Sequence, residues 1–288
     1  MRGFEIRWGM AAALGIAAAF IASAAPGATD TSHDPHKLSA EEERIVLPAI
    51  CRNAIPEKHQ FKCAELLGYP SSGAAFNENT RKATGEISLA AIAYGNFTTN
   101  DTKEAYVTYL GIEPHADNFG GGIVLRGTKD GWKVERWVPG GQMDTCVALP
   151  GPGLQKMLCL SGYTGMGEDD SSVWILDASQ LARGGALKRD SVLKAQDGRE
   201  ASNPDYYCKS ALSSHRDMLL SVDDLTRSQQ PGILATSKIT NATAADVRDA
   251  CAHGTFSDIG TQDGVVRYRL MQGRIVIDPP PKFAPVDY

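Results

Sequence analysis

The chain has 288 residues, of which 22% are charged, and its formal net charge is -5 at pH 7. A chain of this length can bury enough apolar surface for one large domain without a disulfide scaffold, on the usual ~100–200 residues per domain. The acidic balance and the absence of any block of Lys and Arg exclude the electrostatic footprint of a nucleic-acid-binding protein, whose affinity depends on cations that meet phosphates.

The first 24 residues have the pattern of a cleaved secretory signal. Arg2 and Arg7 give a positive start, Met10 to Ala22 is apolar, and Ala22-Ser23-Ala24 has the small-x-small pattern of a signal-peptidase site. A membrane anchor is the alternative, but the apolar run is shorter than the ~20 residues that a helix needs to cross a bilayer. We therefore expect a secreted or periplasmic mature protein with no stable membrane insertion.

Two segments follow this leader. Residues 25–37 are rich in Pro, Gly, Thr, Asp and His, which predicts a flexible linker. Residues 38–70 predict a helical hairpin. Ser39, with Glu42 three residues later, forms a capping-box pattern at the start of the first helix. Pro56 can begin a second helix, and Gly68 can end it.

Residues 71–278 are expected to form a β-rich domain, because short β-branched or aromatic runs alternate with Gly, Asn and Asp. Four runs without room for helices between them predict an antiparallel meander: Ile87–Tyr94, Ala105–Ile112, Gly122–Arg126 and Trp132–Val138. Further expected strands are Thr145–Leu149, Gln155–Leu160, Ser172–Leu176, Ala186–Leu193, Ser210–Val222, Gly232–Thr240, Val265–Leu270 and Arg274–Ile277. Ala244–His253 is expected to be helical, and the Pro-rich residues 279–288 a loose tail.

The expected fold is therefore mainly β, with antiparallel meanders that form either an incomplete propeller-like body or a two-sheet sandwich, and with an N-terminal helical hairpin. Both architectures are built from strings of short strands, so the sequence leaves the two alternatives open.

Six cysteines in an oxidising compartment predict three disulfides. Cys146 and Cys159 flank two apolar runs separated by Pro-Gly-Pro-Gly, and a hairpin folded there sets the two cysteines opposite each other. Facing residues of antiparallel strands lie within the separation that a disulfide spans. Cys51 and Cys63 would link the helical hairpin, and Cys208 and Cys251 are then left to pair with each other.

Residues 94–107, Tyr-Gly-Asn-Phe-Thr-Thr-Asn-Asp-Thr-Lys-Glu-Ala-Tyr-Val, resemble the repeat signature of FG-GAP or VCBS-type β-propeller blades. In that family a loop between two blade strands often holds calcium. Gly95 and Phe97 match the signature, and four residues fall where the family places oxygen ligands: Asn96, Thr98, Asn100 and Glu104. The resemblance therefore implies a calcium site at these four residues.

Common catalytic and nucleotide-binding motifs, such as Gly-x-Ser-x-Gly, His-Glu-x-x-His and the phosphate-binding loop, do not occur in the chain. Glu168, Asp169 and Asp170 follow two glycines and could hold a cation or present paired acids to a sugar. A solvated loop is the plainer interpretation of this cluster. His115 lies in a loop between expected strands and could act as a general base.

Trp132 and Trp137 are five residues apart in one expected strand. Because successive side chains of a strand point to opposite faces, we expect one of the two in the core and the other in an exposed binding patch.

These observations favour a secreted or periplasmic, disulfide-stabilised β-rich protein that acts by non-catalytic recognition of an envelope or extracellular ligand or protein. Two alternatives stay open. One is a secreted hydrolase that uses the carboxylates of Glu168, Asp169 and Asp170, and the other is a calcium-stabilised structural module. No cofactor other than calcium is expected.

Overall fold

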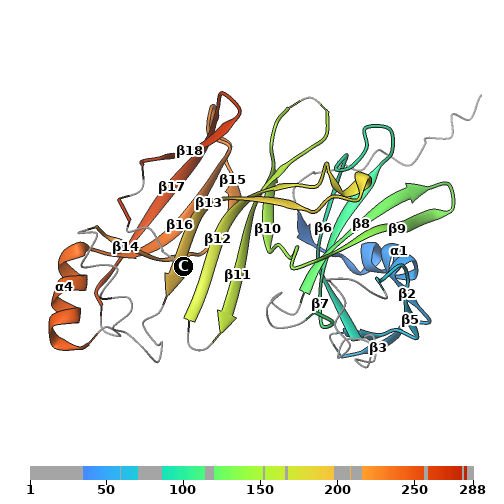
Figure 1. Ribbon diagram of the computed structural model, residues 1–288, viewed down its shortest axis with the longest axis horizontal. Coiled ribbons are helices and arrows are strands. Elements are labelled where there is room, and N and C mark those ends of the chain that lie inside the picture. Colours follow the sequence, from blue (N-terminus) through green and yellow to red (C-terminus); the bar gives the residue numbers. More distant parts are fainter. Residues whose placement is uncertain are drawn as a thin grey trace, which may run out of the picture. The chain divides into compact units, whose positions relative to one another are not determined.

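The structure is a computed structural model that describes residues 35–58, 60–70, 86–113, 120–151, 153–165, 168–197, 208, 216–255, 259–280 and 282–283. The expected leader and most of the expected linker lie outside these ranges. The described chain is mainly β with antiparallel sheets, as the sequence predicts (Figure 1). Three sheets contain most of the strands, and we call them the N-terminal, middle and C-terminal sheets.

The N-terminal sheet is a meander that the first four long strands build. Its central order is β6-β7-β8-β9, with bounds Glu86–Gly95, Glu104–Leu110, Gly120–Thr128 and Gly131–Pro139. The short strands β3 and β4, at Ile55–Glu57 and Gln60–Lys62, extend it beyond β6, and β1 at His36–Lys37 also pairs with β6. A separate two-stranded ladder joins β2 (Cys51–Arg52) to β5 (Glu65–Leu66).

The middle sheet has the order β10-β11-β12-β13, with bounds Thr145–Ala148, Met157–Gly165, Glu168–Asp177 and Lys188–Asp197. A 3-10 turn, η2 at Leu181–Arg183, precedes β13. The C-terminal sheet has the order β14-β16-β17-β18, with β15 on the side of β16; the bounds are Met218–Val222, Thr226–Arg227, Ala235–Ala242, Thr261–Met271 and Arg274–Asp278. All three sheets pair by antiparallel ladders between neighbours in sequence or near-neighbours, which keeps their connections short.

The middle sheet contributes to two separate cores. Cys146 and Met157 pack into a core shared with Tyr106 and other residues of the N-terminal sheet. The next residues along the same strands, Val147 and Leu158, pack into a core shared with the C-terminal sheet. Because side chains alternate between the two faces of a strand, a sheet covered on both faces needs continuous apolar runs. Each neighbouring pair of sheets therefore shares a core, a packing that is common to a two-sheet sandwich and to the blades of a propeller-like body.

Two helices cover the ends of this arrangement. Helix α1, at Ala40–Ile50, packs through Val46 and Ile50 against the outer face of the N-terminal sheet. It begins with the predicted capping box, in which Ser39 Oγ accepts the N–H of Glu42 at 3.2 Å and Glu42 Oε2 accepts the N–H of Ser39 at 2.9 Å. Helix α4, at Ala244–His253, packs on β14 through Val247 and Ala250.

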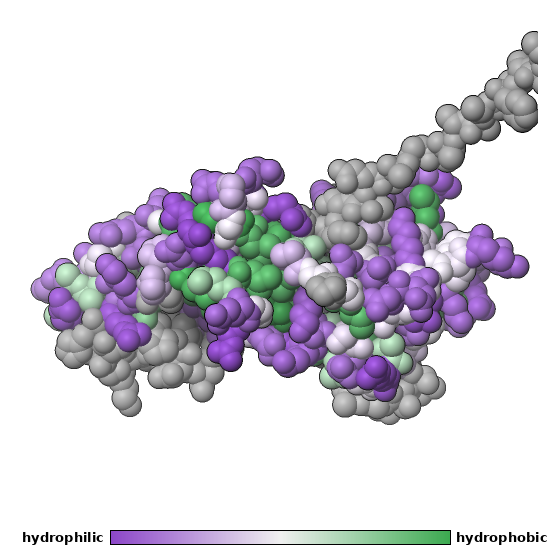
Figure 2. All heavy atoms as spheres, turned by 90° about the horizontal axis from the view of Figure 1, so that it is seen from above, coloured by the Kyte–Doolittle hydropathy of each residue, from purple (hydrophilic) through white to green (hydrophobic). Residues whose placement is uncertain are grey.

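Apolar side chains of the core between the middle and C-terminal sheets also reach the surface. Figure 2 shows hydrophobic surface over these two sheets with hydrophilic residues around it. Partly buried members of that core include Leu149, Ile175, Leu234, Ile275 and Ile277.

The prediction of a second helix in the N-terminal hairpin is wrong. Where Pro56 was expected to begin a helix, the chain forms the β3–β4 hairpin, and Phe61 of β4 pairs with Ile87 of β6. Pro56 lies on β3, the edge strand, where its missing N–H costs no ladder bond. A short helix gains little by itself in water, so pairing with the edge of an existing sheet prevails.

Three smaller expectations are also corrected. His36 and Lys37, at the end of the predicted flexible linker, are paired with β6 instead. Phe283, in the predicted loose tail, forms an isolated bridge with Asp217 and packs on the core between the middle and C-terminal sheets. Asp169 and Asp170 belong to strand β12 rather than to a loop, although Asp169 is exposed.

Trp132 and Trp137 pack on the same core, contrary to the prediction that they face opposite sides. The ladder between β8 and β9 shifts register, with Val124 opposite Arg136 and Leu125 opposite Val134. The extra residue on β9 is a β-bulge, and it reverses the alternation between the two tryptophans. Trp137 is buried, and its Nε1 donates to the backbone oxygen of Leu67 at 3.0 Å.

Candidate functional site

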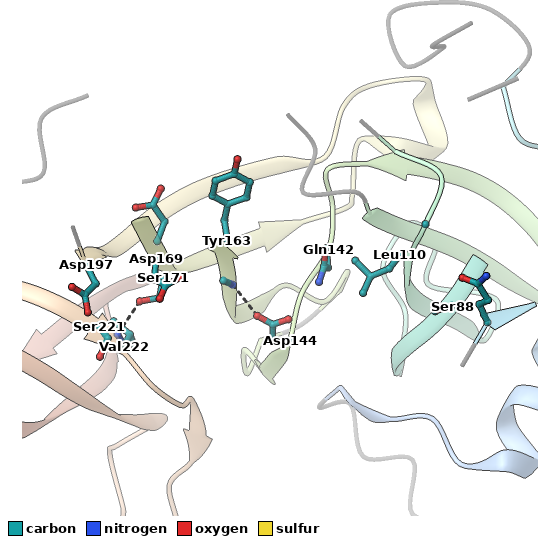
Figure 3. Close-up of a pocket in the computed structure, with 14 residues that line it drawn as sticks. Ser88, Leu110, Gln142, Asp144, Tyr163, Asp169, Ser171, Asp197, Ser221 and Val222 are labelled. Carbon is teal, nitrogen blue, oxygen red and sulfur yellow. Dashed lines mark hydrogen bonds between the residues drawn. The ribbon is translucent and has the colours of Figure 1, made fainter. Parts of the chain in front are cut away.

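A pocket of about 720 Å³ opens where the ends of β6 and β7 approach β11, β12 and the start of the C-terminal sheet (Figure 3). This volume lies within the ~300–1,000 Å³ that small-molecule sites usually occupy. Its polar lining includes Gln142, Asp144, Tyr163, Asp169, Asp170 and Asp197. The remaining lining is mostly small or neutral, with Leu110 and Val222 as its apolar side chains.

Asp144 lies between β9 and β10, in the centre of the pocket wall (Figure 3). Its Oδ2 accepts the N–H of Gly162 on β11 at 2.8 Å, which fixes the direction of the carboxylate. Burial raises the pKa of Asp144, although hydrogen bonds from Gly162 and Gln142 act in the opposite direction. Hydrogen bonds therefore hold the Asp144 carboxylate in place, although burial disfavours its charged form.

Asp169 and Asp197 come from neighbouring strands and stand directly opposite each other in the β12–β13 ladder. Figure 3 shows both near Ser171, which accepts the N–H of Val222 through its Oγ at 2.8 Å. The pair lies at the end of the pocket that faces the C-terminal sheet.

The pocket is electrostatically one-sided. Four of its described lining residues are aspartates, and none of those described is Lys, Arg or His. Clefts lined by one sign of charge concentrate ions of the opposite sign, because the low-dielectric walls focus the field. The arrangement is suited to a ligand with positive charge, and Tyr163, Gln142 and the serines add hydrogen-bonding groups.

The sequence predicted only part of this acidic set. Asp169 and Asp170 line the pocket, whereas nothing is described of the side chain of Glu168. His115, the candidate general base, lies outside the described residues. Asp144 and Asp197 were not singled out, because they come from separate segments that only the sheet pairing brings near Asp169.

Glu113, a close sequence neighbour of His115, links two segments of the chain through hydrogen bonds. It is buried and accepts hydrogen bonds from the hydroxyls of Tyr69, at 3.1 Å, and of Tyr109. Burial raises the pKa of Tyr109, and the nearby Glu113 carboxylate raises it further, so the phenol keeps its proton and stays a donor. These bonds attach the segment after β5 to the N-terminal sheet.

The four predicted calcium ligands lie in and beside the loop between β6 and β7. Glu104, fully buried, accepts the N–H groups of Phe97 and Thr98 through Oε2 at 2.8 and 2.7 Å, and the Thr98 hydroxyl through Oε1. The Arg126 guanidinium lies 3.8 Å from the same carboxylate. The N–H of Asn96 donates to Gln155 Oε1 at 2.8 Å.

Glu104 therefore organises the loop by binding the loop's own donors. Within the described ranges, no three His, Cys, Asp or Glu side chains are arranged so that they could hold a metal ion. The calcium site at Asn96, Thr98, Asn100 and Glu104 stays a prediction.

Three disulfides link Cys51 to Cys63, Cys146 to Cys159 and Cys208 to Cys251, with Cα separations of 5.2, 4.0 and 5.6 Å. These are the three pairs that the sequence predicts. Cys146 and Cys159 stand opposite each other in the β10–β11 ladder. In the part of the chain that the structure describes, no helix is both long and apolar enough to cross a lipid bilayer.

No protein-family model matches this chain, and no curated protein or solved structure has significant similarity to it. The resemblance of residues 94–107 to FG-GAP or VCBS-type blades therefore stays a prediction.

Proposed function

We propose that the protein is exported to an oxidising compartment, periplasmic or extracellular, and acts there by non-catalytic recognition of a small cationic solute in the pocket described above. The leader pattern of residues 1–24 and the three disulfides support the compartment, because such cross-links persist where thiols meet an oxidant. The four aspartates that line the pocket carry the proposal for the ligand.

An amine is the ligand chemistry that fits this lining best. A primary ammonium group donates three hydrogen bonds, and carboxylates accept the strongest of these because both partners are charged. Asp169 and Asp197 at one end and Asp144 in the centre offer two separate places for a positive charge. A linear diamine can therefore neutralise both places at once.

Calorimetric titration with a linear diamine tests this proposal. The wild-type protein should bind the diamine more tightly than a neutral hexose, and added salt should weaken the binding. The double variant Asp169→Asn/Asp197→Asn should lose at least ~10-fold in affinity, since hydrogen bonds to charged groups contribute about 1.5–3 kcal/mol each.

The matched control removes the same charge elsewhere. Asp130 and Asp249 are exposed residues outside the pocket lining, so Asp130→Asn/Asp249→Asn should leave the affinity within about twofold of wild type. Equal losses in the two double variants, or no diamine binding by the wild type, would refute the proposal.

A secreted hydrolase is the second candidate, because Asp169 and Asp170 do lie in a pocket with further carboxylates. Paired carboxylates are the groups that glycoside hydrolysis requires. The triple variant Glu168→Gln/Asp169→Asn/Asp170→Asn separates the two functions. If the wild type hydrolyses aryl glycosides and the folded triple variant does not, the protein is an enzyme and the recognition proposal is wrong.

A further inference from the structure

The outer face of the C-terminal sheet carries an unusual alternation of exposed apolar and cationic side chains. Val266 and Tyr268 of β17 are buried in the core, so the alternate residues of that strand lie on the opposite face. Val265 and Met271 are 48% and 55% exposed on this face, and Val276 of β18 is 40% exposed. Strands β17 and β18 lie side by side in Figure 1.

Each of these apolar side chains stands opposite a cation in the ladder. Val265 faces Lys238, Val276 faces Arg269, and Met271 faces Arg274. Facing residues in a sheet usually pair apolar with apolar or charge with opposite charge, because those contacts stabilise the sheet. Three apolar–cation pairs on one face contribute little to folding, so their common pattern points to a binding surface.

The charge of this face is opposite to that of the whole chain. Lys238, Arg267, Arg269 and Arg274 lie on it, against Asp263 and Asp278. Arg269 is paired with Asp278 at 3.1 Å. None of Lys238, Arg267 and Arg274 forms an ion pair with a described residue, whereas the chain as a whole has a net charge of -5. A local excess of positive charge on an acidic protein favours an anionic partner.

We propose that this face, defined by Lys238, Val265, Arg267, Met271, Arg274 and Val276, docks on the surface of an anionic lipid bilayer. An anionic bilayer offers phosphate headgroups to the cations and an apolar phase to the side chains between them. A soluble polyanion or an acidic peptide backbone offers only the charge. The long aliphatic stems of Lys and Arg allow their charged ends to reach headgroups while the apolar neighbours are buried.

Co-sedimentation with lipid vesicles tests the proposal. The full protein should sediment with vesicles of mixed phosphatidylglycerol and phosphatidylcholine and stay in the supernatant with phosphatidylcholine alone. Binding should fall as salt is raised, because the attraction acts over a Debye length. Each cation near an anionic surface adds roughly a factor of five to the partition coefficient, so Lys238→Gln/Arg267→Gln/Arg274→Gln should lower it on the order of a hundredfold.

Two further variants make the test specific. Met271→Ser/Val276→Ser should weaken binding while keeping its salt dependence, because the charges are unchanged. Lys129→Gln/Lys133→Gln/Arg248→Gln removes the same charge from exposed positions elsewhere and should stay within about threefold of wild type. Circular dichroism and melting temperature verify that each variant is folded; all the replaced residues lie at least partly at the surface.

The docking proposal is overturned if the wild type does not sediment with anionic vesicles or if it sediments equally with neutral ones. It is equally overturned if the two triple variants bind alike, or if heparin binds this face while vesicles do not. The diamine pocket is a separate site, so loss of diamine binding in Asp169→Asn/Asp197→Asn should leave vesicle binding unchanged.

Discussion

Gly122 lies so close to the side chain of Tyr106 that this position has no room for a Cβ atom. A Cβ at this position would lie 2.1 Å from the hydroxyl oxygen of Tyr106, which is fully buried and donates to the backbone oxygen of Gly141 at 2.6 Å. Gly122→Ala should therefore destabilise the fold by about 1–3 kcal/mol, measured by urea unfolding. Gly151→Ala is the control, since its Cβ meets no atom within 4 Å. Equal stability of the two variants would contradict the packing described.

Glu104 should be needed for the loop between β6 and β7. Glu104→Gln replaces one acceptor oxygen by an amide donor, which then faces the N–H groups or the hydroxyl that the carboxylate accepts. An unsatisfied buried polar group costs about 1–3 kcal/mol, so urea unfolding should show a loss of this size. A variant as stable as wild type would show that the carboxylate does not hold the loop.

The melting temperature of the protein in the presence of a chelator tests the predicted calcium site. A ligand that binds only the native state must raise its melting temperature. If calcium occupies Asn96, Thr98, Asn100 and Glu104, a chelator lowers the melting temperature of the purified protein. An unchanged melting temperature removes the calcium proposal and leaves the internal hydrogen bonds of Glu104 as the stabilising feature of the loop.

Asp144 and Asp177 should give opposite dependences of stability on pH. Burial raises the pKa of Asp144, so its contribution to stability is present below the unfolded pKa of about 3.9 and is lost as pH rises through the folded pKa. Asp144→Asn should therefore be at least as stable as wild type at pH 7. The same substitution should weaken diamine binding.

For Asp177, burial alone would raise the pKa, but hydrogen bonds from Lys156, at 2.7 Å, and Ser179 outweigh burial and lower it. Its stabilisation is present above about pH 3.9 and is lost as pH falls through the lowered folded pKa. Asp177→Asn should destabilise the protein at pH 7, with the difference from wild type shrinking in acid. Urea unfolding across pH measures both variants, and equal signs for the two at pH 7 would contradict the account.

At the scale of elements, the β10–β11 hairpin should depend on its disulfide. Cys146 and Cys159 are 13 residues apart in sequence, and a loop of this size is stabilised by about 3 kcal/mol when it is cross-linked. Cys146→Ala/Cys159→Ala should lower the free energy of unfolding by about that amount and leave Cys51–Cys63 intact in a non-reducing peptide map. A variant with wild-type stability would show that the hairpin does not need the link.

Local patterns predict the elements of this chain well where neighbours in sequence decide the structure. Helix α4 has the predicted bounds Ala244–His253, and β6 to β9 follow the predicted meander. The β3–β4 hairpin was missed because its pairing partner, β6, is distant in sequence. The bulge in β9 was missed because the extra residue is defined only by the register of β8.

The candidate site was less predictable for the same reason. Asp169 and Asp170 form a visible acidic run, so the sequence could point to them. Asp144 and Asp197 are single aspartates in unremarkable surroundings, and they join the pocket only after β11, β12 and β13 pair. Assembly of acids from separate strands depends on long-range contacts that one sequence does not display.

At the scale of the whole molecule, three sheets with shared cores are combined with three disulfides and an unequal distribution of charge. The pocket is acidic, whereas the outer face of the C-terminal sheet carries an excess of cations. These two surfaces are separate and have opposite charge. The two proposed interactions therefore use different surfaces: a cationic solute would bind in the pocket, and an anionic bilayer would bind the outer face of the C-terminal sheet.

All of these functions require that the chain leaves the cytoplasm, and mass spectrometry of the protein isolated from its native cells tests that requirement directly. The predicted result is a chain that lacks residues 1–24 and contains three disulfides, Cys51–Cys63, Cys146–Cys159 and Cys208–Cys251. An intact leader together with six free thiols would contradict it.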